Sequence, residues 1–436
     1  MKMFEQPFMH ILIASPYLPW PLIDGGRVAQ FRTFEAMRGA CTFTLVVPVY
    51  SLEEEAYARE FAGKFSNVTV EAVRCFHVPS PLTPRARLRR TAGKLLRTIF
   101  PPPKAQTSGQ PSQASSKSSP WYPFDPLPPD FLAAVEKHLN QGCDIFQAEF
   151  AEMLTLGPLM AGRVPSLFAH IQLHFIYARR FLEANGVSGV NSRYITERMI
   201  REESAYLKTF DSVFTLSEVD RQALNSFCPG LEIHVSPCPS PEEPMPVALR
   251  LERPLQNFVF LAGEGHQANV DGFRWFMKQV WPAIKGRLPE ARVEVIGKWS
   301  PAAQASLPNH EDINFLGFIP EMMKTLQNKV MIVPVFVGSG IRTKILAAWG
   351  ASCPVVTTTV GVEGLPGQTG EHFIIADDAP AFAMACIELS QNVDKLNQFA
   401  VNGLALVQKY FSLAAVRKTR LEIYEKLLAA RRLTKS

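Results

Sequence analysis

A glycine turn followed at once by two cations is the feature of this sequence best suited to chemistry. A β-rich apolar run over 330–335 meets the turn Gly338-Ser339-Gly340, and a helix-like segment then carries Arg342 and Lys344 in its first turn. Free N–H groups at a helix start attract anions, and glycines let a ligand approach the backbone closely. Cations at that end oppose the helix dipole at a cost of roughly 0.3–1 kcal/mol each, a conflict that a bound phosphate would remove. The pattern predicts an anion site, with two solvated side chains as the alternative.

Length and composition set the frame for this site. The chain has 436 residues, enough for two domains, and its net charge of +5 is mild. No zinc-finger spacing or aromatic RNA-binding signature occurs, so no nucleic-acid partner is predicted. The seven cysteines are scattered without a C-x-x-C pair, which is typical of free thiols in a reducing compartment. The start of the chain lacks a signal-peptide layout, and the apolar runs fall short of a membrane span, so we predict a cytoplasmic protein.

The first half of the sequence alternates strand-like and helix-like segments. Helices are predicted over 27–38 and 191–209. Strands are predicted at 10–15, 42–49, 68–75, 144–150, 166–170 and 212–216. Strands separated by helices favour a parallel α/β sheet, so we predict an N-terminal domain over 1–230.

An insertion interrupts this domain at about 79–129. Its Pro/Ser/Gln-rich second part predicts disorder. Its first part carries six cations between Arg85 and Arg97, interspersed with leucines. Such a segment favours either a peripheral contact with an anionic membrane surface or a solvated loop.

A second α/β pattern follows a proline-rich linker at 231–253. Helices are predicted over 270–285, 379–391 and 413–432, and strands at 257–262, 291–297, 313–318, 330–335, 354–359 and 373–376. The predicted fold class is therefore α/β, with two Rossmann-like parallel-sheet domains, 1–230 and 254–410, that face a central cleft. The last segment, 411–436, is a separate helix.

These segments resemble a known family. The stretch from Phe258 to Lys298 reads FVFLAGEGHQANVDGFRWFMKQVWPAIKGRLPEARVEVIGK, and INFLGF, VPVFVGSGIRTKIL, PVVTTTVGVEGL and HFIIADD follow in order. The chain resembles the GT-B glycosyltransferases, in particular glycosyltransferase family 4. The resemblance covers both halves apart from the insertion and is strongest over 257–378.

The resemblance implies a glycosyltransferase, in detail a hexosyltransferase. Such an enzyme transfers sugar from a nucleotide-diphosphate donor to a glycan, lipid-linked or small-molecule acceptor, with retention of configuration and without a metal. The chain has no Asp-x-Asp motif and no metal-spaced His/Cys/Glu cluster. The resemblance adds no cofactor beyond the donor substrate. It also implies a role in polysaccharide biosynthesis and a last helix that packs back on the first domain.

The resemblance also assigns site residues. Arg342 and Lys344, with the amides of Ser339, Gly340 and Ile341, are expected to hold the donor diphosphate. Gly25 and Gly26 are expected to face it from the first domain, although an ordinary turn is the alternative there. Three further residues are expected to line the same cleft: Gly263, Gly265 and Asn269.

The first domain offers one candidate for the acceptor side. His170 ends a strand-like run where a related histidine often faces the acceptor, and a structural histidine is the alternative. Ser217, Glu218 and Asp220 are predicted to cap a helix and to have no catalytic role.

One departure from the family separates two functional hypotheses. Many members carry a Glu-x7-Glu pattern, and the aligned positions here are Ser339 and Ala347. Glu363 is either a replacement carboxylate near the cleft or a turn residue. An active glycosyltransferase is one hypothesis, and a weak or inactive nucleotide- or glycan-binding relative is the other. Another GT-B enzyme, such as a nucleotide-sugar epimerase, is a third.

Overall fold

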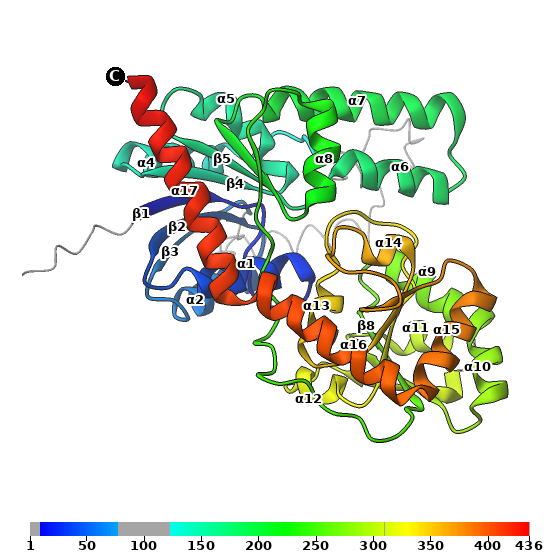
Figure 1. Cartoon of the computed structure of the whole chain (residues 1–436). Coiled ribbons are helices and arrows are strands. Elements are labelled where there is room, and N and C mark those ends of the chain that lie inside the picture. Colours follow the sequence, from blue (N-terminus) through cyan, green and yellow to red (C-terminus); the bar gives the residue numbers. More distant parts are fainter. Residues whose placement is uncertain (1–8, 77–122, 309, 436) are drawn as a thin grey trace, which may run out of the picture.

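The chain folds around two parallel β-sheets, one in each half (Figure 1). The structure, a computed structural model, describes residues 9–76, 123–308 and 310–435. The first sheet has the order β3-β2-β1-β4-β5-β6-β7. Its strands are β1 (Met9–Ala14), β2 (Cys41–Val49), β3 (Val68–Arg74), β4 (Ile145–Glu149), β5 (Ser166–His170), β6 (Ser212–Thr215) and β7 (Ile233–Val235).

The second sheet has six strands, all parallel, in the order β10-β9-β8-β11-β12-β13. Its strands are β8 (Asn257–Leu261), β9 (Arg292–Ile296), β10 (Ile313–Gly317), β11 (Val330–Val333), β12 (Val355–Thr357) and β13 (Ile374–Ile375). The predicted fold class is confirmed. Most of these strands are buried on both faces, as expected where helices cover both sides of a parallel sheet.

Both sheets reverse their strand order at one point, and the predicted glycine segments follow those strands. In the first sheet the order reverses between β1 and β4, and the segment with Gly25 follows β1. In the second it reverses between β8 and β11, which lead into Gly263 and Gly338 respectively. Ligands of open α/β sheets bind outside the carboxyl ends of strands at such switch points. The segments with Gly25, Gly263 and Gly338, which the sequence analysis named as candidates, therefore lie where a ligand of this fold class is expected to bind.

The first helix of the chain begins at the predicted glycines. Gly25 and Gly26 are the first residues of a helix instead of a loop before it, because Asp24 caps the helix by accepting from the Arg27 amide at 2.9 Å. The helices of this half are α1 (Gly25–Ala36), α2 (Leu52–Ala62), α4 (Pro129–Gln141), η1 (Ala151–Leu156), α5 (Gly157–Met160), α6 (His174–Ala184), α7 (Gly189–Leu207) and α8 (Glu218–Phe227).

The helices of the second half differ from the prediction in several places, including short helices that were not predicted. The helix predicted over 270–285 begins at Gln267 and contains a π-helical turn, and α16 was not predicted. The elements are α9 (Gln267–Trp275), η2 (Phe276–Val280), α10 (Trp281–Arg287), α11 (Pro301–Ala305), η3 (His310–Asp312), α12 (Met322–Leu326), α13 (Thr343–Gly350), α14 (Thr359–Val362), α15 (Ala379–Gln391), α16 (Val393–Leu406), η4 (Val407–Phe411) and α17 (Leu413–Lys435).

The linker predicted at 231–253 is wrong at its start, because β7 lies within it and pairs with β6. The prolines that suggested a linker begin only after Val235, so they do not interrupt the strand. The remaining boundaries of the two domains stay a prediction. The insertion predicted at about 79–129, with its basic stretch, falls largely outside the described residues.

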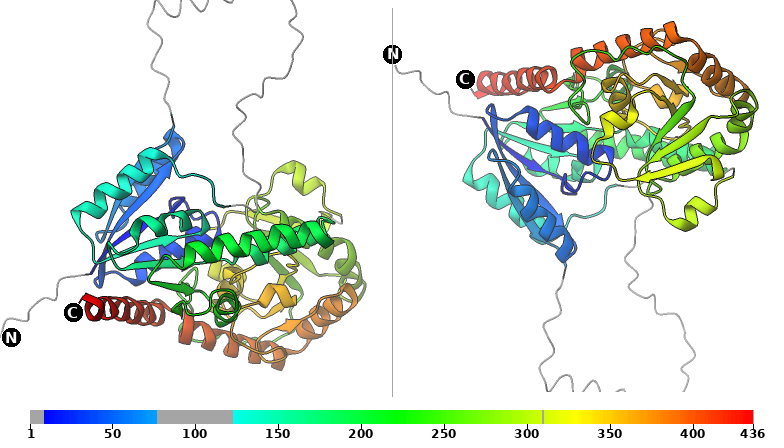
Figure 2. Two further views of the ribbon diagram at one scale, coloured as in Figure 1. Left: turned by 90° about the horizontal axis from the view of Figure 1, so that it is seen from above. Right: turned by 90° about the horizontal axis from the view of Figure 1, so that it is seen from below.

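The last helix joins the two halves. α17 contacts α1 and runs along the first sheet's side of the molecule (Figures 1 and 2). Its Tyr424 hydroxyl donates to Gln147 at 2.8 Å, and its Arg420 donates to Ser236 at 2.9 Å. One core cluster contains Phe34 of the first half, Trp349 of the second and Tyr424.

The helical stretch Val393–Leu433 has the length and apolar composition of a membrane span. Part of its surface is buried within the protein, including Phe399, Phe411 and Tyr424. The core helix of a protein outside the membrane has the same two properties, so the stretch is weak evidence for a membrane contact.

Candidate functional site

The loop after β11 holds a half-buried arginine, Arg342, with two buried donor atoms that lack partners. Arg342 Nη1 donates to the carbonyls of Ser339 at 2.7 Å and Gly340 at 2.9 Å. Its Nε and Nη2 atoms are buried without a hydrogen-bond partner. Burial lowers the pKa of Arg342 to about 10, and the neighbouring Arg180 adds to that effect. An anion could accept hydrogen bonds from these two unpartnered donors. Such charge-assisted hydrogen bonds are among the strong ones.

The second predicted cation lies beside it in the same helix start. Lys344 Nζ donates to Asn269 Oδ1 at 3.0 Å, so α13 and α9 meet here as the sequence predicted. Burial, with a smaller contribution from Arg342, lowers the pKa of Lys344 to about 7. Lys344 Nζ also lies 5.3 Å from the centre of the Phe260 ring. This lysine is therefore readily shifted between its charged and neutral forms near neutral pH.

The start of α1 faces the start of α13 across the two halves. A Cβ atom on Gly25 would lie only 2.8 Å from Thr343 Oγ1, and one on Gly26 would lie 3.1 Å from Tyr17 Oη. The close approach of Thr343 and Tyr17 is a packing reason for glycine at both positions, and the role of Gly25 and Gly26 in facing the donor stays a prediction. Two helix N-termini oppose each other here, and both attract negative charge.

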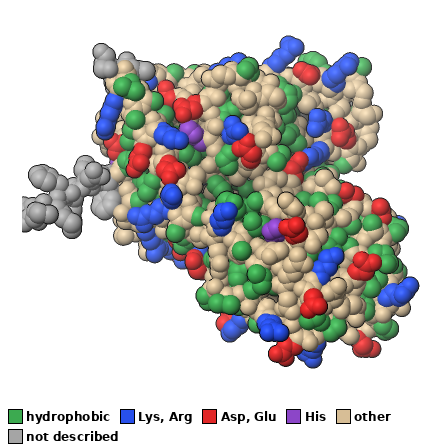
Figure 3. Space-filling view, in the orientation of Figure 1, with side chains coloured by type: hydrophobic (Ala, Val, Ile, Leu, Met, Phe, Trp, Pro, Cys, Tyr) green, Lys and Arg blue, Asp and Glu red, His purple; other side chains and the backbone are tan. Residues whose placement is uncertain are grey.

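The two halves touch at the predicted cleft. Ser339 Oγ donates to the Leu173 carbonyl at 3.1 Å. Gly340 has φ of +75°, and a Cβ there would lie 2.9 Å from the Ile171 carbonyl oxygen. The outline of the molecule is indented between the two halves in the space-filling view (Figure 3). At Ser339 and Gly340 the two halves are in direct contact.

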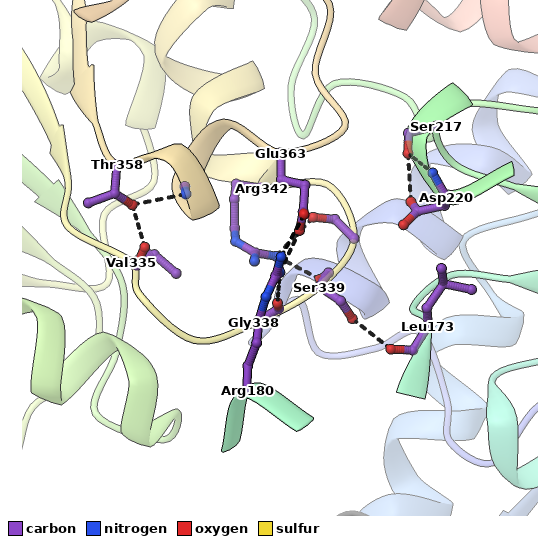
Figure 4. Close-up of polar contacts among 12 residues, drawn as sticks. Leu173, Arg180, Ser217, Asp220, Val335, Gly338, Ser339, Arg342, Thr358 and Glu363 are labelled. Atoms are coloured by element: carbon purple, nitrogen blue, oxygen red, sulfur yellow. Dashed lines mark hydrogen bonds and ion pairs between the residues drawn. The ribbon is translucent and has the colours of Figure 1, made fainter. Parts of the chain in front are cut away.

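A pair that the sequence analysis missed closes this junction. Arg180 of α6 donates to both carboxylate oxygens of Glu363, at 2.6 and 2.7 Å, and to the Gly338 carbonyl at 2.6 Å (Figure 4). Both side chains are about three-quarters buried. Glu363 ends α14 and belongs to the predicted site. Nothing in the sequence marks Arg180, because its partner lies 183 residues away.

His170, the candidate for the acceptor side, is deeply buried at the end of β5. Its Nε2 lies 2.5 Å from Glu203 Oε1 of α7, and both side chains are only 1% exposed. The second oxygen of Glu203 has no partner. Nearby, burial lowers the pKa of His174, whose Nδ1 is also buried without a partner. The geometry gives His170 a structural partner and leaves its acceptor role a prediction.

Asp220 does more than cap a helix. Ser217 caps α8 as predicted, because its Oγ accepts from the Asp220 amide at 3.1 Å. The same hydroxyl donates to Asp220 Oδ2 at 2.6 Å. Burial raises the pKa of Asp220, while His170 and Arg342 are close enough to oppose that rise. Figure 4 shows its carboxylate directed from α8 toward the loop of Arg342 and Glu363.

Of the other predicted residues, Ile341 and Gly263 are packed against neighbours, whereas Gly265 is not. Ile341 is half-buried next to Arg342, and Gly263 packs against the backbone of Lys298. Gly265 is exposed, and a Cβ there would meet nothing within 4 Å, so its position does not require glycine. Ala347, at the second family carboxylate position, is fully buried in the core. Within the described ranges, no three His, Cys, Asp or Glu side chains form a group that could hold a metal ion.

Solved structures with the same fold include several glycosyltransferases. Sucrose-phosphate synthase from Thermosynechococcus elongatus matches with a TM-score of 0.64 and 15% identity, over 97% of this chain and all of that one. The pneumococcal O-GlcNAc transferase GtfA, in complex with UDP and GlcNAc, matches with a TM-score of 0.63 and 11% identity over the same shares. A variant of S. aureus TarM, in complex with fondaparinux, alpha-GlcNAc-glycerol and UDP, matches with a TM-score of 0.61 and 8% identity, over 96% of this chain and all of that one. These likenesses show the GT-B fold.

The family comparison agrees with the fold. Residues 256–392 match the family described as Glycosyl transferases group 1. Together with the fold, this match confirms the predicted resemblance to GT-B glycosyltransferases, while family 4 in particular stays a prediction. The enzyme class that they support is a glycosyltransferase. A 44.6 kDa protein in the cps region of Klebsiella pneumoniae is 25% identical over 164 residues, which are 36% of this chain. The chain spans 42% of the length of that relative.

Proposed function

We propose that this protein transfers a sugar from a nucleotide-diphosphate donor to a glycan, lipid-linked or small-molecule acceptor. One observation carries the proposal: Arg342 has two buried, unpartnered donor atoms next to Lys344, at a helix start that faces Gly25. A diphosphate would satisfy these donors and stabilise the cations. The same contacts would stabilise the leaving group as charge develops on it, which is the largest need of this reaction.

The remaining parts of the proposal have narrower support. UDP is the nucleotide that we propose first, because it appears with the similar GtfA and TarM structures. Polysaccharide biosynthesis is supported by the relative in a cps region. Retention of configuration and independence of metal follow only from the family resemblance. We propose a cytoplasmic location, with a peripheral membrane contact as the alternative.

The residues of the proposed donor site come from both halves. Arg342 and Lys344 bind the diphosphate with the amides near Ser339, Gly340 and Ile341. Asn269 orients Lys344, Gly25 and Gly26 form the opposite wall, and Gly263 and Glu363 border the site. His170 is proposed to face the acceptor side.

A second candidate function is donor or glycan binding without turnover. Neither family carboxylate position offers a carboxylate: Ser339 bonds to the Leu173 carbonyl and Ala347 is buried in the core. Two polar contacts to the donor would therefore be missing, each worth about 1.5–3 kcal/mol for a charged hydrogen bond.

Incubation with a panel of UDP-, GDP- and ADP-sugars separates the two candidates. Release of nucleotide, raised by a suitable acceptor, is expected from the enzyme. A thermal shift with nucleotide but no release would favour binding without turnover. Neither release nor a shift with any of these compounds would exclude both.

A further inference from the structure

The interdomain pair of Arg180 and Glu363 lies in the same junction as the proposed diphosphate site. Arg180 donates to Glu363 through two hydrogen bonds and to the carbonyl of Gly338 through a third. Gly338 and Arg342 lie in one loop, which leads from β11 into α13. A Cβ on Gly338 would lie 2.4 Å from Arg342 Nη2. Both guanidinium groups therefore border one short stretch of backbone.

The charges of this junction are unevenly matched. Three cations, Arg180, Arg342 and Lys344, gather around the loop, and two carboxylates, those of Glu363 and Asp220, oppose them. Arg342 and Lys344 are desolvated. Glu363 is the partner of Arg180 and the largest favourable charge for Arg342. A buried cation is costly without a negative partner, and Glu363 provides one while the junction is closed.

We propose that Glu363 acts as an internal substitute for the donor diphosphate, and that Arg180 is a third diphosphate-binding cation that exchanges Glu363 for the donor. This inference rests on the proposed function and deepens it. The ligand class is a nucleoside diphosphate, and the exchange is a change of ionic partners without a covalent step. Glu363 accepts from both Nη1 and Nη2 of Arg180, so a donor phosphate must displace this carboxylate to bind Arg180 through the same atoms.

The proposal gives opposite signs to two substitutions in one pair. Glu363→Gln removes a competing negative charge, so we expect UDP to bind about tenfold more tightly. Arg180→Gln removes a binding cation, so we expect UDP to bind about tenfold more weakly. If the pair only held the halves together, both substitutions would loosen the junction and change the affinity in the same direction.

Isothermal titration of the full chain with UDP, repeated with inorganic pyrophosphate, measures these signs. The matched control is Glu243→Gln, which breaks the 3.2 Å pair between Arg32 of α1 and the linker and should leave UDP binding unchanged. Circular dichroism checks that each variant is folded. Small-angle scattering of the free Glu363→Gln protein should show a larger radius of gyration that UDP reverses.

Two failures remain distinguishable. If the wild type binds UDP but Glu363→Gln binds it equally or more weakly, this inference is overturned and the proposed function stands. If neither the wild type nor Glu363→Gln binds UDP or pyrophosphate, the inference and the proposed diphosphate site are both overturned.

Discussion

The two walls of the interdomain junction treat their buried charges in different ways. On the wall of the second half, Arg342 keeps two donors without partners, and Lys344 is held by one neutral amide. On the wall of the first half, His170 is paired with Glu203 and Asp220 with Ser217. The first arrangement leaves cationic donors for an anion, whereas the unpartnered atom of the His170–Glu203 pair is a carboxylate oxygen, which repels one. The comparison suggests that the second half binds the donor and that the first half supplies a fixed surface against it.

The largest expected effect comes from removing Arg342 and Lys344, the two cations that we propose bind the donor diphosphate. Arg342→Ala combined with Lys344→Ala should weaken UDP binding about a thousandfold, because two charged hydrogen bonds of about 1.5–3 kcal/mol each are lost. The melting temperature should change little, since the removed cations are desolvated. Titration calorimetry measures the affinity, and Lys278→Ala, which removes an exposed cation of the same half, is the control. Binding that survives in the double variant would place the diphosphate elsewhere.

Removing the partner of His170 in the first half should lower the free energy of unfolding. Glu203→Ala leaves His170 buried without its partner, and breaking a buried pair of this kind costs about 3 kcal/mol. Urea denaturation measures the loss. Glu197→Ala, on an exposed position of the same helix, should cost less than about 0.5 kcal/mol. Equal urea midpoints for the two variants would show that the His170–Glu203 contact does not stabilise the fold.

A third test uses the titration of Lys344, whose pKa is lowered to about 7. An anion favours the charged form, so binding above pH 7 must take up a proton. UDP affinity should fall by up to about tenfold per pH unit above pH 7 and flatten below it, where Lys344 is already charged. Titrations in buffers of different ionisation enthalpy detect the proton. Lys344→Met should abolish both the slope and the uptake, and a slope that persists would assign it to another group.

The smallest effect concerns the helix that joins the two halves. Tyr424→Phe removes the 2.8 Å hydrogen bond from α17 to Gln147 and should cost about 1 kcal/mol of unfolding free energy. Thermal unfolding measures the change, and UDP affinity should stay within twofold of the wild type. A large loss of affinity would mean that α17 positions the donor wall as well as holding the halves together.

The grouping of Arg342, Lys344 and the start of α1 could be predicted from the sequence, whereas most contacts on the opposite side could not. The donor-binding role of this group stays a prediction. The loop over 338–344 and the start of α1 follow single strands, so strand, glycine and helix signals lie next to one another in the chain. Arg180 and Glu203 acquire their partners only through tertiary contacts 183 and 33 residues away. The contact of Ser339 with Leu173, which spans 166 residues, was not predicted for the same reason. Position 347 was interpreted by alignment alone, without the packing that buries it.

Hydrogen exchange of the backbone amides, with and without UDP, tests the central claim most directly. The account predicts that UDP slows exchange in two separate peptides, one over 24–30 at the start of α1 and one over 338–346 at the start of α13. Slower exchange at other places, with both of these peptides unchanged in a protein that demonstrably binds UDP, would contradict it.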